Sequence, residues 1–306
     1  MVKAIVIGSG SVGSELCAQL KSLGWEIIAI VKSREIVSNE GEIIETDWQS
    51  LTADVVFVSI PTDGGEKALQ YIEHFLKRNI PVVTCEKGAL AYHFDTLKPY
   101  IKNLGFNATV GGGTQMISYL KGRVPEKIDS LCGVLNGTLN FIFSKLGEGK
   151  TSSEVLKEIL EKKYAEPGAN TFEEIVAGEL GDLHKKGIML ANVSGLLKQS
   201  LKPTKDFVIE KDILDKAINS PKKYRFLFSM SRTRQGSFVA GVHYEADGFY
   251  IEMGLYDVSG FDLKLPEGVD NGFFIQEGES LYSITGPGAG PVPTALAMIA
   301  DAARLI

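Results

Sequence analysis

Cysteine and long apolar runs are scarce in this chain of 306 residues, and each scarcity excludes a class of protein. The three cysteines, Cys17, Cys85 and Cys132, are odd in number and widely spaced, so they indicate neither a disulfide framework nor a zinc site. We therefore expect a reducing, cytoplasmic location. No apolar run approaches the ~18 residues of a membrane-spanning helix, and the first residues have the pattern of a strand rather than of a signal peptide. No membrane partner is expected.

Positive charge is also too scarce for nucleic-acid binding. The chain has 32 Lys and Arg residues against 38 Asp and Glu residues, which gives a net charge of −6, and the basic residues form no stripe along the sequence. Hydrophobic residues make up 44% of the chain and charged residues 23%, as in ordinary globular proteins. A chain of this length can bury a large core, and we expect two domains.

The first residues predict a strand, a tight turn and a helix that Gly24 closes. The turn reads Gly8-Ser9-Gly10-Ser11-Val12-Gly13, which is the G-x-G-x-x-G pattern of dinucleotide-binding folds. In that pattern Gly8 permits the bend, Gly10 admits a pyrophosphate and Gly13 allows close helix–strand packing. The helix start at Ser11 and Val12 offers free N–H groups to the anion. A purely structural glycine turn is the alternative.

The end of the second expected strand, 25–31, bears on the choice of cofactor. It leads into Lys32-Ser33-Arg34, where NAD-binding folds usually carry an acidic residue that accepts hydrogen bonds from the ribose. Basic and hydroxylic side chains suit a 2′-phosphate instead, so we expect NADP, with NAD as the alternative. The competing interpretation is a solvated loop with two cations.

Strands and helices alternate up to the glycines at 111–113 and predict an α/β fold with a doubly wound parallel sheet. Ligands bind at the carboxyl ends of the strands in such sheets. Pro61-Thr62 is therefore expected to cover the adenosine and the nicotinamide riboside, and Lys87 to contact substrate or cofactor. Further strands are expected at 43–44, 55–60, 80–84 and 106–110, and a helix at 94–104 is expected to end at Gly105.

The later part of the chain has the pattern of an α+β domain. A strand at 128–135, a turn at Asn136-Gly137 and a short helix at 138–146 are expected first. Capping boxes at 151–154 and 171–174 then open two helices, the second of which reaches about residue 197.

That long helix carries Glu179, Asp182 and Lys186 on one face. Taken alone, this pattern favours a solvated ion-pair ladder.

Five β-rich segments follow the long helix and offer more apolar surface than two or three helices can cover. We expect a homodimer formed through this sheet, with a monomer as the alternative. The expected domains are a cofactor domain of the Rossmann type at 1–125, a substrate-binding and dimerisation domain at 126–285, and a C-terminal helix at 286–306 that packs back on the first domain. The β-rich segments are 226–231, 238–244, 249–256, 273–276 and 281–284.

The stretch Gly133-Val134-Leu135-Asn136-Gly137-Thr138-Leu139-Asn140-Phe141-Ile142 resembles the signature of homoserine dehydrogenases. Stretches at 83–91, 108–113 and 286–295 agree with that family in order and spacing, and the likeness extends over the whole chain, as in the short, monofunctional form. The resemblance implies that NAD(P)H reduces L-aspartate 4-semialdehyde to L-homoserine, on the route to threonine and methionine.

The resemblance also implies roles for individual residues. It implies a catalytic lysine at Lys186, assisted by Lys87, and carboxylates at Glu166 and Asp182 that hold the substrate's ammonium group. It adds Gly288 to the residues that contact the cofactor. The sodium site of the family, built mostly from backbone carbonyls, would fall on Asn107, Val110, Gly112 and Thr114.

Four departures from the family pattern stand out. Asn107 replaces the usual glutamate of the sodium site, and Glu86 stands where the family often has asparagine. The segment from 166 to 182 is longer than is common. The expected second aspartate upstream of Asp182 is missing, and Glu179 or Glu174 is left to replace it.

Two other functions compete with this interpretation. One is a reductase of another small amino-acid aldehyde or imine, and the other is a non-catalytic NAD(P)-binding regulator. The joint presence of the two lysines and two carboxylates favours an enzyme, but a fold alone decides nothing about function.

Overall fold

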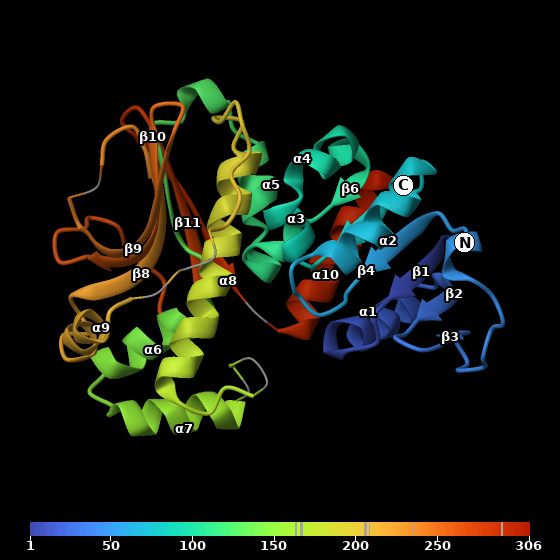
Figure 1. Ribbon diagram of the computed structural model, residues 1–306, viewed down its shortest axis with the longest axis horizontal. Helices are drawn as coiled ribbons and strands as arrows, with labels where there is room; N and C mark the ends of the chain where they lie inside the picture. Colours follow the sequence, from blue (N-terminus) through green and yellow to red (C-terminus); the bar gives the residue numbers. More distant parts are fainter. Residues whose placement is uncertain (163, 166–167, 205–206, 208, 235, 289) are drawn as a thin grey trace. The chain divides into compact units, whose positions relative to one another are not determined.

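The computed structural model describes the chain except for residues 163, 166, 167, 205, 206, 208, 235 and 289. The described residues form two compact units, one of residues 1–117 and 290–306, the other of residues 118–288 (Figure 1). The units divide near residue 117 rather than at the expected 125.

The first unit is built on a six-stranded sheet in the order β3-β2-β1-β4-β5-β6. All neighbours pair in parallel except β3, which is antiparallel to β2 at one edge. The expected α/β fold with a largely parallel sheet is therefore confirmed. The strands are β1 (Lys3–Ile7), β2 (Glu26–Val31), β3 (Ile36–Val37), β4 (Val55–Val58), β5 (Val82–Thr84) and β6 (Leu104–Gly105).

Helices cover both faces of this sheet because the connections on the two sides of β1 run in opposite directions along the sheet. The connection from β1 to β2 runs through α1 (Ser11–Ser22), and the connection from β4 to β5 runs the other way through α2 (Glu66–Lys77). Right-handed crossovers then place α1 and α2 on opposite faces. The C-terminal helix α10 (Pro291–Leu305) packs beside α1, in one core cluster with side chains of β1, β4 and β5.

The predicted positions of two strands in this unit are wrong. The short third strand forms at Ile36–Val37, whereas Ile43 makes only an isolated bridge to Val37 and stays 69% exposed. The sixth strand is Leu104–Gly105, and residues 107–109 that follow form a 3-10 turn. Asp301 of α10 accepts a hydrogen bond from the backbone N–H of Asn107, so this backbone bonds to a side chain rather than to a strand.

The expected helix at 94–104 is also wrong in part. It is split into α4 (Phe94–Leu97) and a 3-10 segment at Lys98–Asn103, and Gly105 belongs to β6 instead of ending a helix. Pro99 lies at the start of the 3-10 segment, where its missing N–H removes a helical hydrogen bond. The short helix α3 (Gly88–Tyr92) precedes α4.

The second unit is a six-stranded antiparallel sheet packed under helices. Its order is β12-β11-β7-β8-β10-β9. The helix α8 (Phe172–Val193) crosses β8 and β10, and a Cβ on its Gly187 would overlap with the side chain of Met253. The strands are β7 (Ser130–Val134), β8 (Tyr224–Ser231), β9 (Phe238–Ala246), β10 (Phe249–Asp257), β11 (Asp270–Glu277) and β12 (Ser280–Pro287).

The other helices of the second half agree broadly with the sequence. Both capping boxes form, at Thr151–Glu154 and Thr171–Glu174. The long helix ends at Val193, four residues before the expected end, because Gly195 adopts a left-handed conformation with φ of +75°. The helices are α5 (Met116–Lys121), α6 (Gly137–Gly147), α7 (Ser152–Lys162) and α9 (Lys211–Ile218), besides α8.

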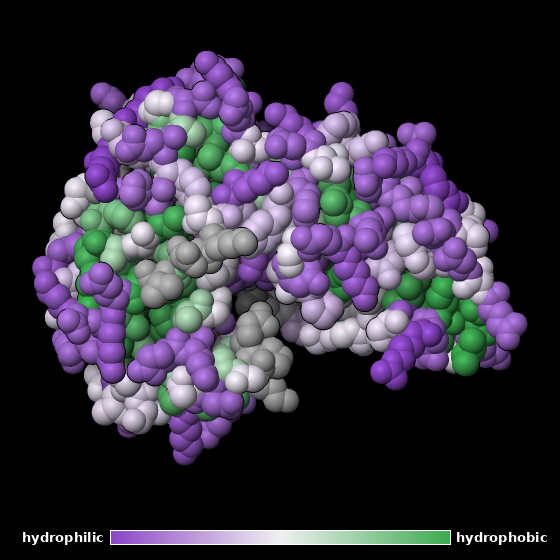
Figure 2. All heavy atoms as spheres, viewed as in Figure 1, coloured by the Kyte–Doolittle hydropathy of each residue, from purple (hydrophilic) through white to green (hydrophobic). Residues whose placement is uncertain are grey.

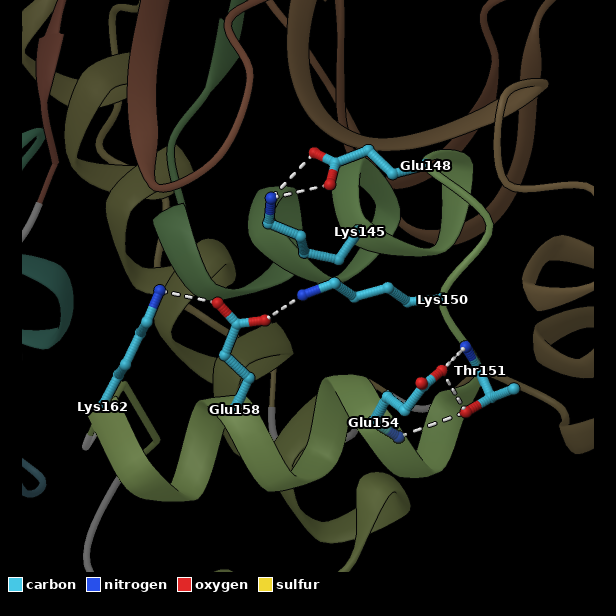
Figure 3. A network of polar contacts seen from close by, with 7 residues as sticks. All are labelled: Lys145, Glu148, Lys150, Thr151, Glu154, Glu158 and Lys162. Carbon is cyan, nitrogen blue, oxygen red and sulfur yellow. Dashed lines mark hydrogen bonds and ion pairs between the residues drawn. The ribbon is translucent and has the colours of Figure 1, made fainter.

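Ion pairs on the surface tie α7 to the segment that precedes it (Figure 3). The carboxylate of Glu158 accepts hydrogen bonds from Lys150 and Lys162, both at 2.6 Å. These two ammonium groups lower the pKa of Glu158 to about 2. Lys162 also lies 5.4 Å from the centre of the Phe141 ring, so the last turn of α7 is tied to α6.

Hydrophilic side chains cover much of both units in the view of Figure 2, and a broad group of apolar residues lies on the second unit, at the left of the picture. Among the described helices, none combines the length and the hydropathy that crossing a bilayer requires.

Candidate functional site

The glycine turn after β1 has the geometry that its sequence predicts. Gly8 has φ of +109°, and a Cβ there would overlap with the carbonyl of Ser59. A Cβ on Gly13 would overlap with the carbonyl oxygen of Gly8, so α1 packs directly on the turn. Nothing lies within 4 Å of the position that a Cβ on Gly10 would take. Gly10 is the N-cap of α1, and the first N–H groups of the helix, from Ser11 on, have no partner within the helix. The turn therefore fits a pyrophosphate.

The loop after β2 presents one cation to solvent. Lys32 pairs with Glu35 at 2.7 Å, and the backbone N–H of Lys32 bonds to the Glu35 carbonyl, which closes a turn around Ser33 and Arg34. Arg34 is exposed and has no acidic partner among the described residues. The turn leaves the guanidinium of Arg34 available to an anion.

The loops after β4 and β5 lie against each other. Pro61 and Thr62 are exposed, and the hydroxyl of Thr62 accepts a hydrogen bond from the N–H of Lys87 at 3.5 Å. A Cβ on Gly65 would overlap with the backbone of Gly88, so the first loop rests on the start of α3. The predicted cofactor residues of this unit all follow carboxyl ends of strands.

Glu86 is a buried carboxylate next to Lys87, with 1% of its surface exposed. It accepts hydrogen bonds from the N–H groups of Gly88 at 2.6 Å and of Ala89 at 2.8 Å, and so caps α3. Burial raises the pKa of Glu86, and the two N–H donors oppose that rise. The glutamate holds the turn that presents Lys87.

A second constellation lies wholly in the second unit. The Asn136 side-chain amide donates to the carboxylates of Glu179 at 2.6 Å and Asp182 at 2.9 Å. The ammonium of Lys186 donates to Asp182 at 2.6 Å and to the carbonyl of Leu135 at 2.9 Å. The spacing of three and four along α8 brings the three charged residues to one face, as the sequence predicts.

This face is buried, so the solvated ion-pair ladder is wrong. Glu179 is 7% exposed and Lys186 is 9% exposed. The cluster thus brings two carboxylates and one ammonium together away from solvent. Buried charge of this kind is costly unless it is paired, and carboxylates are the groups that pair with a cationic group of a ligand.

Asn136 is the residue that sequence reasoning missed. It forms no turn; it is the N-cap of α6, and its Oδ1 accepts a hydrogen bond from the N–H of Leu139 at 2.8 Å. Asparagine before a helix is a common N-cap, so the signal was present. Its second function, the bridge to both carboxylates of α8, depends on a contact across more than forty residues.

Of the two candidates for the missing second acidic residue, Glu179 is the one that lies in the buried cluster with Asp182. Glu174 instead belongs to the capping box of α8, where it bonds to the backbone of Asn170 and Thr171. Glu166 lies outside the described residues. The nearest described anchor is Tyr164, whose carbonyl accepts a hydrogen bond from Thr138 at 2.9 Å.

The expected sodium residues lie in the first unit, around two 3-10 turns. Asn107 donates its side-chain amide to Asp301. Its Oδ1 is buried and has no partner among the described residues, and Val110, Gly112 and Thr114 are buried nearby in sequence. A buried oxygen without a donor fits a hard cation that takes oxygen ligands. No cluster of three His, Cys, Asp or Glu residues that could hold a metal ion occurs among the described residues.

Gly288 has a structural reason to be glycine. A Cβ there would overlap with the side-chain amide of Asn271 on β11. The turn after β12 therefore closes directly over that amide.

Comparison with known proteins gives one family. The family model described as homoserine dehydrogenase matches residues 117–302. The homoserine dehydrogenase of Sulfurisphaera tokodaii is 25% identical over 86% of this chain and 80% of that protein. The enzyme of that name from Bacillus subtilis is 28% identical over 88% of this chain, which spans 61% of the Bacillus protein.

Solved structures agree in fold. A putative homoserine dehydrogenase from Archaeoglobus fulgidus has a TM-score of 0.71 at 23% identity and 98% coverage of both chains. A hyperthermophilic archaeal homoserine dehydrogenase in complex with NADPH has a TM-score of 0.73 at 19% identity, over 99% of this chain and 97% of that one.

Proposed function

The chain belongs to the homoserine dehydrogenase family, and we propose that it catalyses the reaction of that family, the NAD(P)H-dependent reduction of L-aspartate 4-semialdehyde to L-homoserine. The observation that carries this proposal is the buried cluster of Asn136, Glu179, Asp182 and Lys186. A protein that only bound nucleotide would have no use for buried charges outside the nucleotide-binding unit. The cluster therefore favours an enzyme over a regulator.

The charges of the cluster match the substrate. Homoserine carries an ammonium group, and the carboxylates of Glu179 and Asp182 are suitable counter-ions for it. The amide of Asn136 donates to both carboxylates and so holds them side by side. We assign the substrate's ammonium to these carboxylates, together with Glu166.

Lys186 meets the requirement of the chemical step. The bound reduced nicotinamide supplies the hydride, and negative charge then develops on the aldehyde oxygen. The Lys186 ammonium stabilises that charge and delivers a proton to it. The carbonyl of Leu135 and the carboxylate of Asp182 fix the ammonium in place beforehand, and Lys87 is assigned as an assisting cation.

NADP is the proposed cofactor. The open space at Gly10 and the exposed Arg34 support it, because the first accommodates a pyrophosphate and the second a 2′-phosphate. The oxygen of Asn107 and nearby carbonyls are proposed to hold a sodium ion. Roles in threonine and methionine biosynthesis, a cytoplasmic location and a homodimer stay predictions.

The proposal is tested by spectrophotometric assay of homoserine oxidation with NAD and NADP in parallel. Turnover of homoserine is expected with at least one nucleotide. Nucleotide binding without oxidation of homoserine would overturn the proposal and favour a regulator. Faster turnover of a different amino-acid alcohol would point to the other reductase.

A further inference from the structure

Asn271 is a fully buried amide that the proposed reaction does not yet use. It lies on β11, and none of its surface is exposed. Its Nδ2 donates to the carbonyl of Leu135 at 3.3 Å, whereas its Oδ1 has no hydrogen-bond partner among the described residues. Leaving a buried acceptor without a partner costs folding free energy. What distinguishes Asn271 from other buried asparagines is the carbonyl to which its amide donates.

The carbonyl that Asn271 contacts is the one that anchors the proposed catalytic lysine. Leu135 O accepts from Lys186 at 2.9 Å and from Asn271 at 3.3 Å. On the basis of the proposed function, we propose that Asn271 is a positioning residue, which acts on the reaction by sharing this carbonyl with the Lys186 ammonium.

The surroundings hold the amide in one orientation. Gly288 follows β12, and a Cβ at that position would overlap with all three atoms of the Asn271 amide group. The turn at Gly288 therefore limits rotation of the side chain, and the amide is preorganised before any ligand binds.

The peptide between Leu135 and Asn136 links this amide to the whole cluster. Its carbonyl side holds Lys186, and the side chain of Asn136 holds the carboxylates of Glu179 and Asp182. With Asn271 in place, the carbonyl divides its lone pairs between two donors. Without it, the Lys186 ammonium is the only side-chain donor to this carbonyl among the described residues. The Lys186 ammonium then binds the carbonyl more tightly and is less available to the substrate oxygen.

The proposal is tested with Asn271→Leu, which keeps the approximate volume and removes the amide. We expect kcat for homoserine oxidation to fall at least tenfold, with less than threefold change in KM for homoserine and in the dissociation constant of NADP. The pH profile of kcat should move by half a unit or more, and the solvent or substrate deuterium isotope effect should rise. Both readouts are independent of the fraction of active enzyme, so a purely structural defect would not move them.

Asn140→Leu is the matched control. Asn140 is also a buried asparagine with an unpartnered Oδ1, but its amide donates to the carbonyls of Pro266 and Asp270 instead of to Leu135. This variant should lose stability and keep the pH profile and isotope effects of the wild type.

Asn271→Ala serves if the leucine variant does not fold, because it removes the amide donor without adding bulk or charge. It should show the same changes in pH profile and isotope effect. If both readouts match the wild type in the folded variant, Asn271 has no positioning role. A wild-type protein that does not oxidise homoserine would instead overturn the proposed function.

Discussion

Lys186 is held by two acceptors, a carboxylate and a backbone carbonyl, and both lie in the second unit. Lys186→Ala should therefore leave the nucleotide-binding turn intact and remove turnover. We expect less than a tenth of wild-type kcat, which is at least ~1.4 kcal/mol of barrier. Steady-state assay and NADP titration measure the two effects. Lys185→Ala, one position earlier on α8, should retain near-normal turnover; comparable losses in both variants would contradict a specific role for Lys186.

Substitutions at Glu179 and Glu174 distinguish substrate binding from helix capping. Glu179→Gln keeps an oxygen that can accept the Asn136 amide but removes the charge that faces the substrate's ammonium. A charge-assisted hydrogen bond contributes roughly 1.5–3 kcal/mol, so KM for homoserine should rise about tenfold or more. The affinity for NADP should not change.

The matched variant for this test is Glu174→Gln. It weakens the capping box and should lower the thermal midpoint without altering KM. If Glu174→Gln raised KM and Glu179→Gln did not, the assignment of the second carboxylate would be reversed.

Lys32 and Arg34 are two basic residues of the loop after β2, and they differ in whether an acidic side chain binds them. Lys32 is already paired with Glu35, so Arg34 is the side chain expected to bind the 2′-phosphate. Arg34→Ala should weaken NADP binding about tenfold and leave NAD binding almost unchanged, as measured by fluorescence titration. An equal loss for both nucleotides would show that the loop does not recognise the phosphate.

At the scale of elements, α8 shows how far sequence periodicity reaches. The capping box at Thr171 predicts where the helix begins, and the spacing of the charges predicts that they share one face. Periodicity does not show which residues pack against that face. Here one of them is Asn136, which lies 43 residues before Glu179 in the chain and donates a hydrogen bond to it. Burial of the charges therefore followed only from the tertiary structure.

The errors around β6 have the same origin. The segment 94–110 reads locally as one helix and one strand, and Pro99 alone argues against that. The decisive partner is Asp301, which bonds to Asn107 across 194 residues. In contrast, the strand and turn at Gly8 were predictable because the glycine pattern itself is local, even though one contact that requires glycine at Gly8 is with the distant Ser59.

The ion pairs of Glu158 with Lys150 and Lys162 predict that the protein loses stability in acid. The pKa of Glu158 is about 2 in the folded protein, below its ordinary value of 4.5. A carboxylate whose folded pKa is depressed stabilises the fold above its unfolded pKa, and this contribution is lost as the pH falls from about 4.5 to 2.

The difference in unfolding free energy between wild type and Glu158→Gln should thus be constant above pH 5 and shrink toward pH 2. Denaturant unfolding at a series of pH values measures it. Glu161→Gln on the same helix is the control, because its partner Lys157 lies 3.8 Å away. A difference for Glu158→Gln that does not vary with pH would rule out the pairing in solution.

At the scale of the whole molecule, the sheet of the second unit bears on the expected homodimer. The sheet face away from α8 carries Cys132, Ser229, Glu252 and His243 in register across four strands, so its centre is less apolar than the sequence led us to expect. Cys132 is half-buried there, and desolvation raises the pKa of its thiol to about 12. The support for a dimer comes instead from the edge strands.

Both edge strands, β9 and β12, alternate between exposed and half-buried residues, and each pairs with only one neighbour among the described strands. They expose Val239 and Leu281, which are 42% and 50% accessible. Exposed edges with apolar side chains favour association, and two-fold symmetry is its commonest form.

Sedimentation at micromolar concentration should give twice the chain mass of 33.2 kDa. Combined Val239→Lys and Leu281→Lys should shift the protein to the monomer, whereas Leu296→Lys on α10, 49% exposed in the first unit, should leave the dimer intact. A wild-type protein of 33.2 kDa would refute the dimer, and a dimer that survives the double substitution would move its interface away from these edges.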